Sequence, residues 1–308
     1  MSELNPHSPI GVFDSGMGGL TVLSELVSAL PGEDFIYLGD TARVPYGSRS
    51  PSTILRYSRE VSHHLLQFNI KMLVIACNTV SAHAESILRQ ELPCPVVGVI
   101  LPGARAVVDQ TSGGRVGVIG TRSTIKSGAY EREIRALNGD LSIFSRACPL
   151  LVPVVEEGWM DKKVTAQILQ EYMSEMVREE VDTLVLGCTH YPLLKKAIRD
   201  QFPELCLIDS SVETARAVKQ QLQQRNLLKG SEPAEPGSGS AAGDSPSRNV
   251  QPGPASEMAM SADPRKSSVG SVRILLTDIT DHIESLERLF FRHPFQSLEE
   301  VQIDEMSR

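Results

Sequence analysis

The sequence predicts an α/β fold of two pseudo-symmetric lobes, each a mainly parallel sheet flanked by helices. Short apolar runs alternate with helical patterns, as they do in parallel βαβ units. Similar segments also recur at a nearly fixed offset, which indicates a duplicated unit. Each copy contains a strand-to-helix turn with a cysteine. Because ligands bind beyond the carboxyl ends of parallel strands, we expect the active site in the cleft between the lobes.

The clearest of these turns is built by residues 183–194, Thr-Leu-Val-Leu-Gly-Cys-Thr-His-Tyr-Pro-Leu-Leu. Its first four residues have the apolar character of a buried strand, which Gly187 ends. A helical pattern covers residues 193–202, and Thr189 is expected to cap that helix. Cys188 would then lie at a helix N-terminus, where the helix dipole is expected to lower the pKa of a thiol.

A second turn of the same design occurs earlier in the chain. The apolar residues 72–76 end at Cys77, and a helical pattern follows. The offset from Cys77 to Cys188 is 111 residues (188 − 77), and that from Cys94 to Cys206 is 112 (206 − 94). We interpret this self-similarity as two lobes that present one thiol each across a cleft.

The first lobe begins with a glycine-rich turn between a strand and a helix. Free backbone N–H groups at such a turn can bind an anion. A dinucleotide-binding fingerprint would need a further glycine where Thr21 stands, so we expect no nucleotide cofactor. The predicted elements of this region are strands at 10–13, 35–38, 72–76 and 95–100, and helices at 20–30, 52–68 and 80–92.

Pro102 and Gly103 are interpreted as the change of lobe, so that residues 101–209 form the second lobe. Strands are expected at 115–119, 183–186 and 206–209, and an amphipathic helix at 165–180.

Residues 229–270 differ in composition from the rest of the chain. They contain no aromatic residue and are rich in Gly, Ser and Pro, so they cannot bury enough surface to offset their ordering entropy. We expect a disordered insertion there. Residues 10–100, 210–228 and 271–303 are together expected to form the first lobe, with a helix at 212–228, a strand at 272–276, a helix capped by Asp281 and Glu284, and a short element within 297–303.

Composition limits the function further. The 308 residues are 41% hydrophobic and carry a net charge of −8, which disfavours a nucleic-acid-binding protein. The five cysteines have no zinc-ligand spacing and fit a reducing compartment. Neither a signal peptide nor a membrane-spanning segment is evident, so we expect a cytoplasmic protein that does not bind membranes.

Two opposed thiols suit one reaction in particular. One thiolate removes a proton from a tetrahedral carbon, and the other thiol delivers a proton to the opposite face, which inverts the centre without redox change. The residues alone leave open a structural cysteine pair or a single nucleophilic cysteine. Asp14 and Asp40 end strands at the same edge as Cys77, and His190 lies two residues after Cys188. Packing and helix capping are the alternative roles of Asp14 and His190.

Four motifs resemble those of the glutamate racemases, in the aspartate/glutamate racemase family. They are Asp14-Ser15-Gly16-x-Gly18-Gly19-Leu20, Asp40-x4-Pro45-Tyr46-Gly47, Ala76-Cys77-Asn78-Thr79 and Gly187-Cys188-Thr189-His190-Tyr191-Pro192. The resemblance implies a cofactor-independent enzyme that interconverts L- and D-glutamate and supplies D-glutamate for peptidoglycan. It also implies a homodimer, and some members are reported to bind DNA gyrase.

The resemblance assigns the site residue by residue. Cys188 would deprotonate L-glutamate with help from His190, and Cys77 would deprotonate D-glutamate with help from Asp14. Asp40 and Glu157 are further candidates, Glu157 less securely because Glu156 is adjacent. The expected substrate-binding residues are Asp14, Ser15, Tyr46, Gly47, Asn78, Thr79, Thr121, Thr124, Thr189 and His190.

Three other hypotheses stay open at this point. An aspartate racemase would use the same two thiols, and assays with both amino acids separate the two enzymes. A non-catalytic regulatory protein would not need either cysteine. A single-cysteine hydrolase would form a covalent acyl-enzyme and would not need the second thiol.

Overall fold

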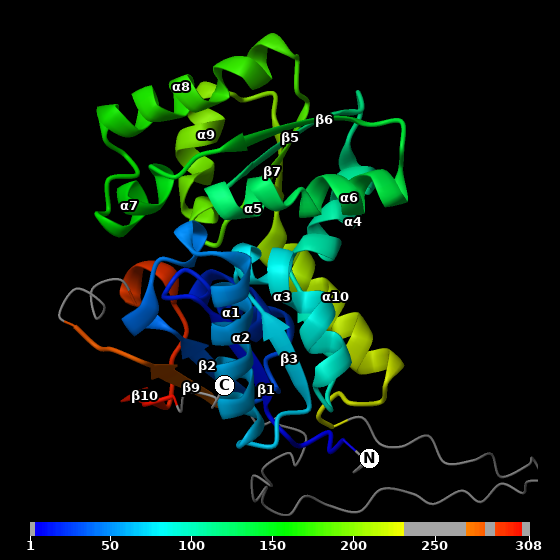
Figure 1. Cartoon of the computed structure of the whole chain (residues 1–308), viewed down its shortest axis with the longest axis vertical. Coiled ribbons are helices and arrows are strands. Elements are labelled where there is room, and N and C mark those ends of the chain that lie inside the picture. Colours follow the sequence, from blue (N-terminus) through cyan, green and yellow to red (C-terminus); the bar gives the residue numbers. More distant parts are fainter. Residues whose placement is uncertain (1–3, 231–268, 281–286, 304–308) are drawn as a thin grey trace, which may run out of the picture.

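The computed structural model describes residues 4–230, 269–280 and 287–303. These residues form two α/β lobes, which lie one above the other in Figure 1. The first lobe contains a six-stranded sheet of order β10-β9-β2-β1-β3-β4, and the second lobe a four-stranded sheet of order β6-β5-β7-β8. All strand pairs are parallel, which confirms the predicted fold class.

In the first lobe, strands and helices alternate as the sequence predicts. The strands β1 and β3 are buried along their whole length, as expected for the centre of a sheet covered on both faces. The elements are β1 (Ile10–Asp14), α1 (Leu20–Ala29), β2 (Phe35–Gly39), α2 (Pro51–Leu66), β3 (Met72–Ile75), α3 (Asn78–Glu91) and β4 (Val96–Gly98), with short 3-10 turns at Thr41–Arg43 and Tyr46–Ser48.

The second lobe repeats this order. Its elements are α4 (Ile100–Gln110), β5 (Arg115–Gly120), α5 (Arg122–Ser127), α6 (Ala129–Leu137), β6 (Ser142–Ala147), α7 (Leu151–Glu156), α8 (Lys163–Arg178), β7 (Thr183–Gly187), a 3-10 turn (Tyr191–Leu194), α9 (Lys195–Gln201) and β8 (Cys206–Asp209). The strand order β6-β5-β7-β8 matches β2-β1-β3-β4 of the first lobe. Cys77 and Cys188 follow the equivalent strands β3 and β7, so the two turns occupy the same place in each lobe.

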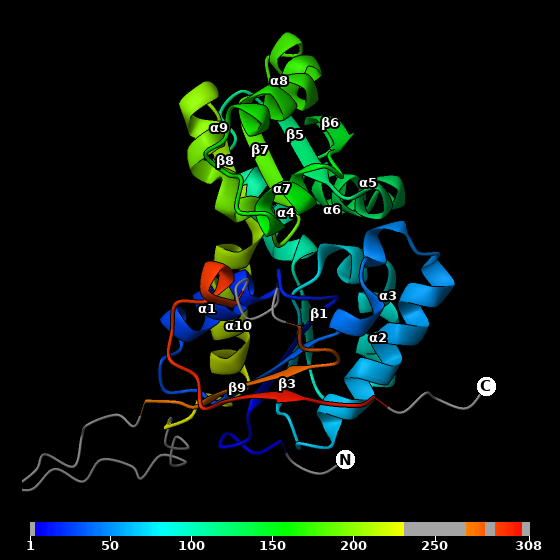
Figure 2. The same cartoon turned by 90° about the vertical axis from the view of Figure 1, so that its left-hand side faces the viewer.

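The chain returns to the first lobe through α10 (Ser210–Gln224), which packs against α1 and α4 (Figures 1 and 2). Beyond the gap in the described residues, β9 (Val272–Leu276) pairs with β2, and β10 (Ser297–Glu300) pairs with β9. Lys229 and Ser271 both hydrogen-bond to Asp34. The residues that flank the 231–268 segment therefore lie next to each other on the first lobe. That segment and the predicted Asp281–Glu284 cap lie outside the described residues.

Pro102 and Gly103, the predicted change of lobe, lie in the first turn of α4, where a missing N–H and a small residue are tolerated. The lobe boundary at this point stays a prediction. One local prediction is wrong. Thr189 caps neither the 3-10 turn Tyr191–Leu194, whose N-cap is His190, nor α9, whose N-cap is Leu194. Among the described residues, we find no helix with the length and apolar content needed to cross a membrane.

Candidate active site

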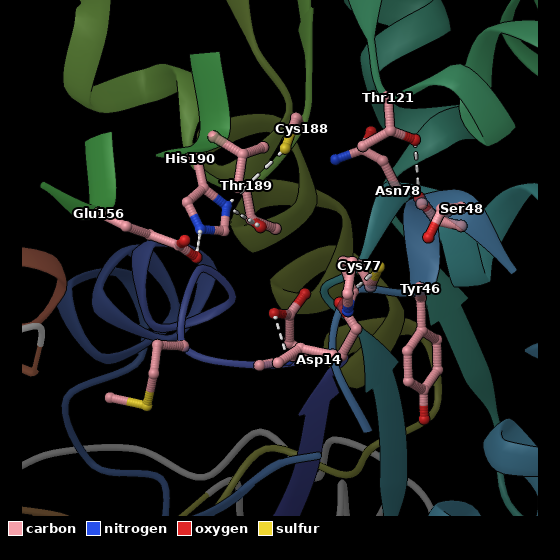
Figure 3. Close-up of a pocket in the computed structure, with 18 of the residues that line it drawn as sticks. Asp14, Tyr46, Ser48, Cys77, Asn78, Thr121, Glu156, Cys188, Thr189 and His190 are labelled. Carbon is pink, nitrogen blue, oxygen red and sulfur yellow. Dashed lines mark hydrogen bonds and ion pairs between the residues drawn. The ribbon is translucent and has the colours of Figure 1, made fainter. Parts of the chain in front are cut away.

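A cavity of about 550 Å³ lies between the carboxyl ends of the two sheets. Figure 3 shows Cys77 and Asp14 entering it from the first lobe, and Cys188 and His190 from the second. Both lobes therefore contribute to one site. Of the residues selected from the sequence, those that line it are Asp14, Ser15, Tyr46, Gly47, Cys77, Asn78, Thr79, Thr121, Cys188, Thr189 and His190.

Cys77 lies at the N-terminal cap of α3, as the sequence predicts, but its pKa moves in the opposite direction. Burial and the nearby Asp14 carboxylate raise the pKa of Cys77 to about 12. The hydroxyl of Ser15, 3.5 Å from the sulfur, and the backbone N–H of Val80 oppose this rise without cancelling it. The helix N-terminus alone therefore does not produce a thiolate here, because desolvation penalises the charged form more strongly.

Asp14 lies at the end of β1 and is almost completely buried. Its Oδ2 accepts a hydrogen bond of 3.0 Å from the backbone N–H of Gly16. Its Oδ1 has no hydrogen-bond partner among the described residues. Burial raises the pKa of Asp14 although His190 and nearby backbone N–H groups act to lower it. An unpartnered buried carboxyl oxygen is an available site for a cationic or hydrogen-bonding ligand.

Cys188 is paired with a histidine that is itself paired with an acid. The sulfur lies 3.8 Å from Nδ1 of His190, and Nε2 of His190 lies 3.0 Å from Oε1 of Glu156. Burial acts to lower the pKa of His190, but Cys188 and Glu156 outweigh burial and raise it to about 10. Nδ1 of His190 is therefore within reach of a proton exchanged with the Cys188 sulfur, and Glu156 holds the opposite side of the imidazole.

The first lobe holds this histidine in place. A β-carbon at Gly18 would lie 2.5 Å from Nδ1 and Cε1 of His190, so only glycine allows the imidazole to pack against the turn. The hydroxyl of Thr21 donates a hydrogen bond of 2.9 Å to the carbonyl of Thr189. The ring of Phe290 contacts His190 edge-on, with centroids 5.2 Å apart. The sequence gives no sign of these contacts, because they join residues far apart in the chain.

Three threonine hydroxyls join the lobes on the other side of the cavity. Oγ1 of Thr79 lies 3.0 Å from that of Thr121 and 3.2 Å from that of Thr124. Thr121 also caps α5 by accepting a hydrogen bond from the Thr124 N–H. Thr79 and Thr121 line the cavity, whereas Thr124 lies behind them and supports them.

Two candidates from the sequence lie elsewhere. Asp40 is completely buried outside the cavity lining, where it bonds to Tyr46, Arg43 and Thr277 and supports the loop beneath the site. Glu157 is exposed, and its neighbour Glu156 lines the cavity instead. The acid at the site is therefore Glu156, because the short helix α7 directs it, and not the next residue, toward His190.

These groups can carry out acid–base chemistry on a small polar molecule. The described residues include no group of three or more His, Cys, Asp or Glu side chains arranged to hold a metal ion. Two thiols, a histidine and the carboxyl groups of Asp14 and Glu156 surround a cavity that also offers unpartnered polar atoms. Proton removal by one thiol and proton delivery by the other are thus within the chemistry of the site.

Comparison with known proteins agrees with this geometry. A family model described as Asp/Glu/Hydantoin racemase matches residues 10–218. A glutamate racemase of Geobacter metallireducens is 54% identical over 225 residues, which cover 73% of this chain and 83% of the relative. A glutamate racemase of Aquifex aeolicus is 48% identical over 210 residues, which cover 68% of this chain and 82% of the relative.

Solved structures give the same result. The crystal structure of a Francisella tularensis glutamate racemase in complex with D-glutamate superposes with a TM-score of 0.81 and 32% identity, covering 98% of this chain and 100% of that one. The sequence and fold comparisons agree, and this chain belongs to the Asp/Glu/hydantoin racemase family.

Proposed function

We propose that this protein is a cofactor-independent glutamate racemase that uses Cys77 and Cys188 as its two acid–base groups. The observation that carries the proposal is that equivalent turns of two similar lobes bring one thiol each to a shared cavity. The relatives named glutamate racemase support glutamate as the substrate. The activity would supply D-glutamate, made in the cytoplasm, for peptidoglycan synthesis.

The reaction needs two proton transfers and no redox change. The Cys188 thiolate removes the α-proton of L-glutamate, which leaves a carbanion at Cα and a neutral Cys188 thiol. The Cys77 thiol then protonates Cα from the opposite face, which yields D-glutamate and a Cys77 thiolate. In the reverse direction the two cysteines exchange roles. His190 would assist Cys188, and Asp14 would assist Cys77.

The bound substrate would itself favour the ionised form of Cys77, the thiol of the first lobe. Burial raises the pKa of Cys77 to about 12. The α-ammonium of glutamate brings a positive charge beside Asp14 and Cys77, and a nearby opposite charge favours the ionised form. The thiolate is therefore formed in the complex more readily than in the free enzyme, which protects it from side reactions.

The carboxylates of the substrate have several donors available. The Nδ2 group of Asn78 is buried and has no partner among the described residues. The hydroxyls of Thr79 and Thr121 line the same wall of the cavity. The N-terminus of α3 begins there, and its free N–H groups attract anions. Preorganised donors of this kind would stabilise the carbanion without a cofactor.

The test is a racemisation assay by circular dichroism with purified protein and no added cofactor. L-glutamate and D-glutamate should each lose optical activity, and L-aspartate should react at least about 100-fold more slowly by kcat/KM. Faster turnover of aspartate would change the substrate and keep the mechanism. If the folded protein racemises neither amino acid, the proposal is wrong and the binding hypothesis takes its place.

Two partner assignments remain predictions from the family resemblance. A homodimer would be tested by size-exclusion chromatography with light scattering, where a monomer mass would contradict it. Binding to DNA gyrase would be tested by pull-down with purified gyrase, using the Cys77→Ser variant to separate binding from turnover.

A further inference from the structure

Tyr130 is a buried tyrosine at the second position of α6, with 3% of its surface exposed. Its hydroxyl donates a hydrogen bond of 2.7 Å to Oδ1 of Asn78. Asn78 belongs to the first lobe and directly follows Cys77, whereas Tyr130 belongs to the second lobe. A side chain of one lobe therefore holds the residue beside the thiol of the other.

This hydrogen bond determines which way the Asn78 amide faces. Because Oδ1 accepts from the phenol, the two N–H donors on Nδ2 are directed away from Tyr130. Asn78 is 2% exposed and lines the cavity, and its Nδ2 has no partner among the described residues. Figure 3 shows Asn78 reaching into the cavity between Thr121 and the Cys188 turn. A buried donor without an acceptor is costly, so this amide is available for an acceptor on a ligand.

The ring of Tyr130 is fixed where the chain crosses between the lobes. A β-carbon at Gly103 in α4 would lie 3.3 Å from Cε1 of the ring, and one at Gly187 would lie 3.2 Å from Cε2. Gly187 immediately precedes Cys188. The hydroxyl of Ser210, the first residue of α10, lies close to the phenol and donates a hydrogen bond of 3.5 Å to the carbonyl of Leu186. Tyr130 thus packs against the turns of both thiols and against both crossing helices.

Burial raises the pKa of Tyr130 above its usual range, so the phenol keeps its proton throughout the working pH range. A neutral phenol can donate to Oδ1 of Asn78 at every such pH, whereas a phenolate could only accept and would favour the flipped amide. The orientation of Asn78 is therefore constant under the conditions of an assay.

We propose that Tyr130 is a positioning residue that orients the Asn78 amide toward a carboxylate of the substrate, and so sets substrate affinity without touching the substrate. The proposal rests on the proposed function, because it treats Asn78 as a ligand of glutamate. It goes beyond that function by assigning a residue outside the cavity and outside the sequence motifs.

Tyr130→Phe removes the hydroxyl and keeps the ring. We expect the KM for both enantiomers to rise about two- to tenfold, with kcat changed less than about twofold, because the lost contact serves ground state and transition state alike. Thr165→Val is the control, since Thr165 is also buried in the second lobe, lies outside the cavity lining, and its hydroxyl donates a hydrogen bond of 2.6 Å to the carbonyl of Trp159. It should lower thermal stability similarly and leave the KM within about twofold.

A double-mutant cycle tests the route of the effect. In an Asn78→Ala background, Tyr130→Phe should cause no further rise in KM, because the amide on which it acts is gone. If the two substitutions instead raise the KM independently, so that their factors multiply in the double variant, the proposal is overturned. An unchanged KM in Tyr130→Phe when the wild type is active would also overturn it.

A second variant keeps the test decisive if Tyr130→Phe does not fold. Asn78→Asp retains an acceptor for the phenol but replaces the NH2 donors by a second oxygen. The KM should rise more than about tenfold, because a carboxylate would then face the carboxylate of the substrate. A normal KM in this variant would overturn the proposal. Inactive wild-type protein would instead refute the proposed function.

Discussion

Glu156→Gln removes one negative charge from behind His190 and changes little else. Oε1 of Glu156 lies 3.0 Å from Nε2 of His190, whose Nδ1 lies 3.8 Å from the sulfur of Cys188. Burial would lower the pKa of His190, but Cys188 and Glu156 together raise it to about 10. With glutamine at this position the pKa of His190 should fall, so that less imidazolium is present beside Cys188 at alkaline pH.

The expected loss of activity follows from how far the Glu156–His190 pair is exposed to solvent. A charge-assisted hydrogen bond is worth about 1.5–3 kcal/mol, but the Glu156 side chain is 39% exposed, so water screens part of this value. We therefore expect a loss of about 1.4 kcal/mol, which is about tenfold in kcat/KM. Because the two enantiomers have equal free energy, kcat/KM must fall equally in both directions.

Stability should respond to pH with a definite sign. The pKa of His190 is raised in the folded state from 6.5 to about 10. Its contribution to stability is therefore fully present below about pH 6.5 and is lost as the pH rises toward 10. The difference in Tm between wild type and Glu156→Gln should be largest near pH 6 and should vanish near pH 10.

The assay is the pH dependence of kcat/KM for wild type, Glu156→Gln and Glu157→Gln. The last variant is the matched control, because Glu157 is the adjacent acid and is exposed outside the cavity. Glu156→Gln should lose about tenfold in rate and shift the alkaline limb about one pH unit downward, whereas Glu157→Gln should behave as wild type. Equal behaviour of the two variants would refute the role given to Glu156.

Three further changes give clear expectations. Gly18→Ala should lower kcat/KM at least about tenfold without loss of the fold, because its β-carbon would lie 2.5 Å from His190. Wild-type kinetics in this variant would show that the imidazole of His190 has room to move. Thr79→Val breaks two hydroxyl contacts between the lobes, so it should lower the Tm by about 2–4 °C and raise the KM. An unchanged Tm and an unchanged KM would exclude a role for the three threonine hydroxyls. Replacing residues 231–268 by a short Gly-Ser linker should keep the Tm within about 3 °C, because both flanks bond to Asp34; a large loss of stability would contradict this.

The two cysteine turns could be predicted because their signals are local. An apolar strand ends and a cysteine follows in both copies, at Cys77 and Cys188, and the repeat offset relates one turn to the other. The parallel order of the strands follows from the same alternation of strand and helix. The lobe boundaries within the chain stay a prediction, which limited proteolysis would test.

The remaining features depend on contacts that no local pattern contains. Glu156 and Glu157 are adjacent acids, and only the orientation of α7 decides which one meets His190. Tyr130 acts across the two lobes on a residue 52 positions away. A helix N-terminus favours a thiolate, but burial raises the pKa of Cys77, and that burial depends on tertiary packing.

The most direct test of the two-thiol mechanism is α-proton exchange in deuterated water, followed by NMR from each pure enantiomer of glutamate. Wild type should incorporate deuterium at Cα while the sample loses optical activity. Cys77→Ser and Cys188→Ser should each abolish racemisation. Full racemisation by either serine variant would contradict the claim that both thiols carry the proton transfers.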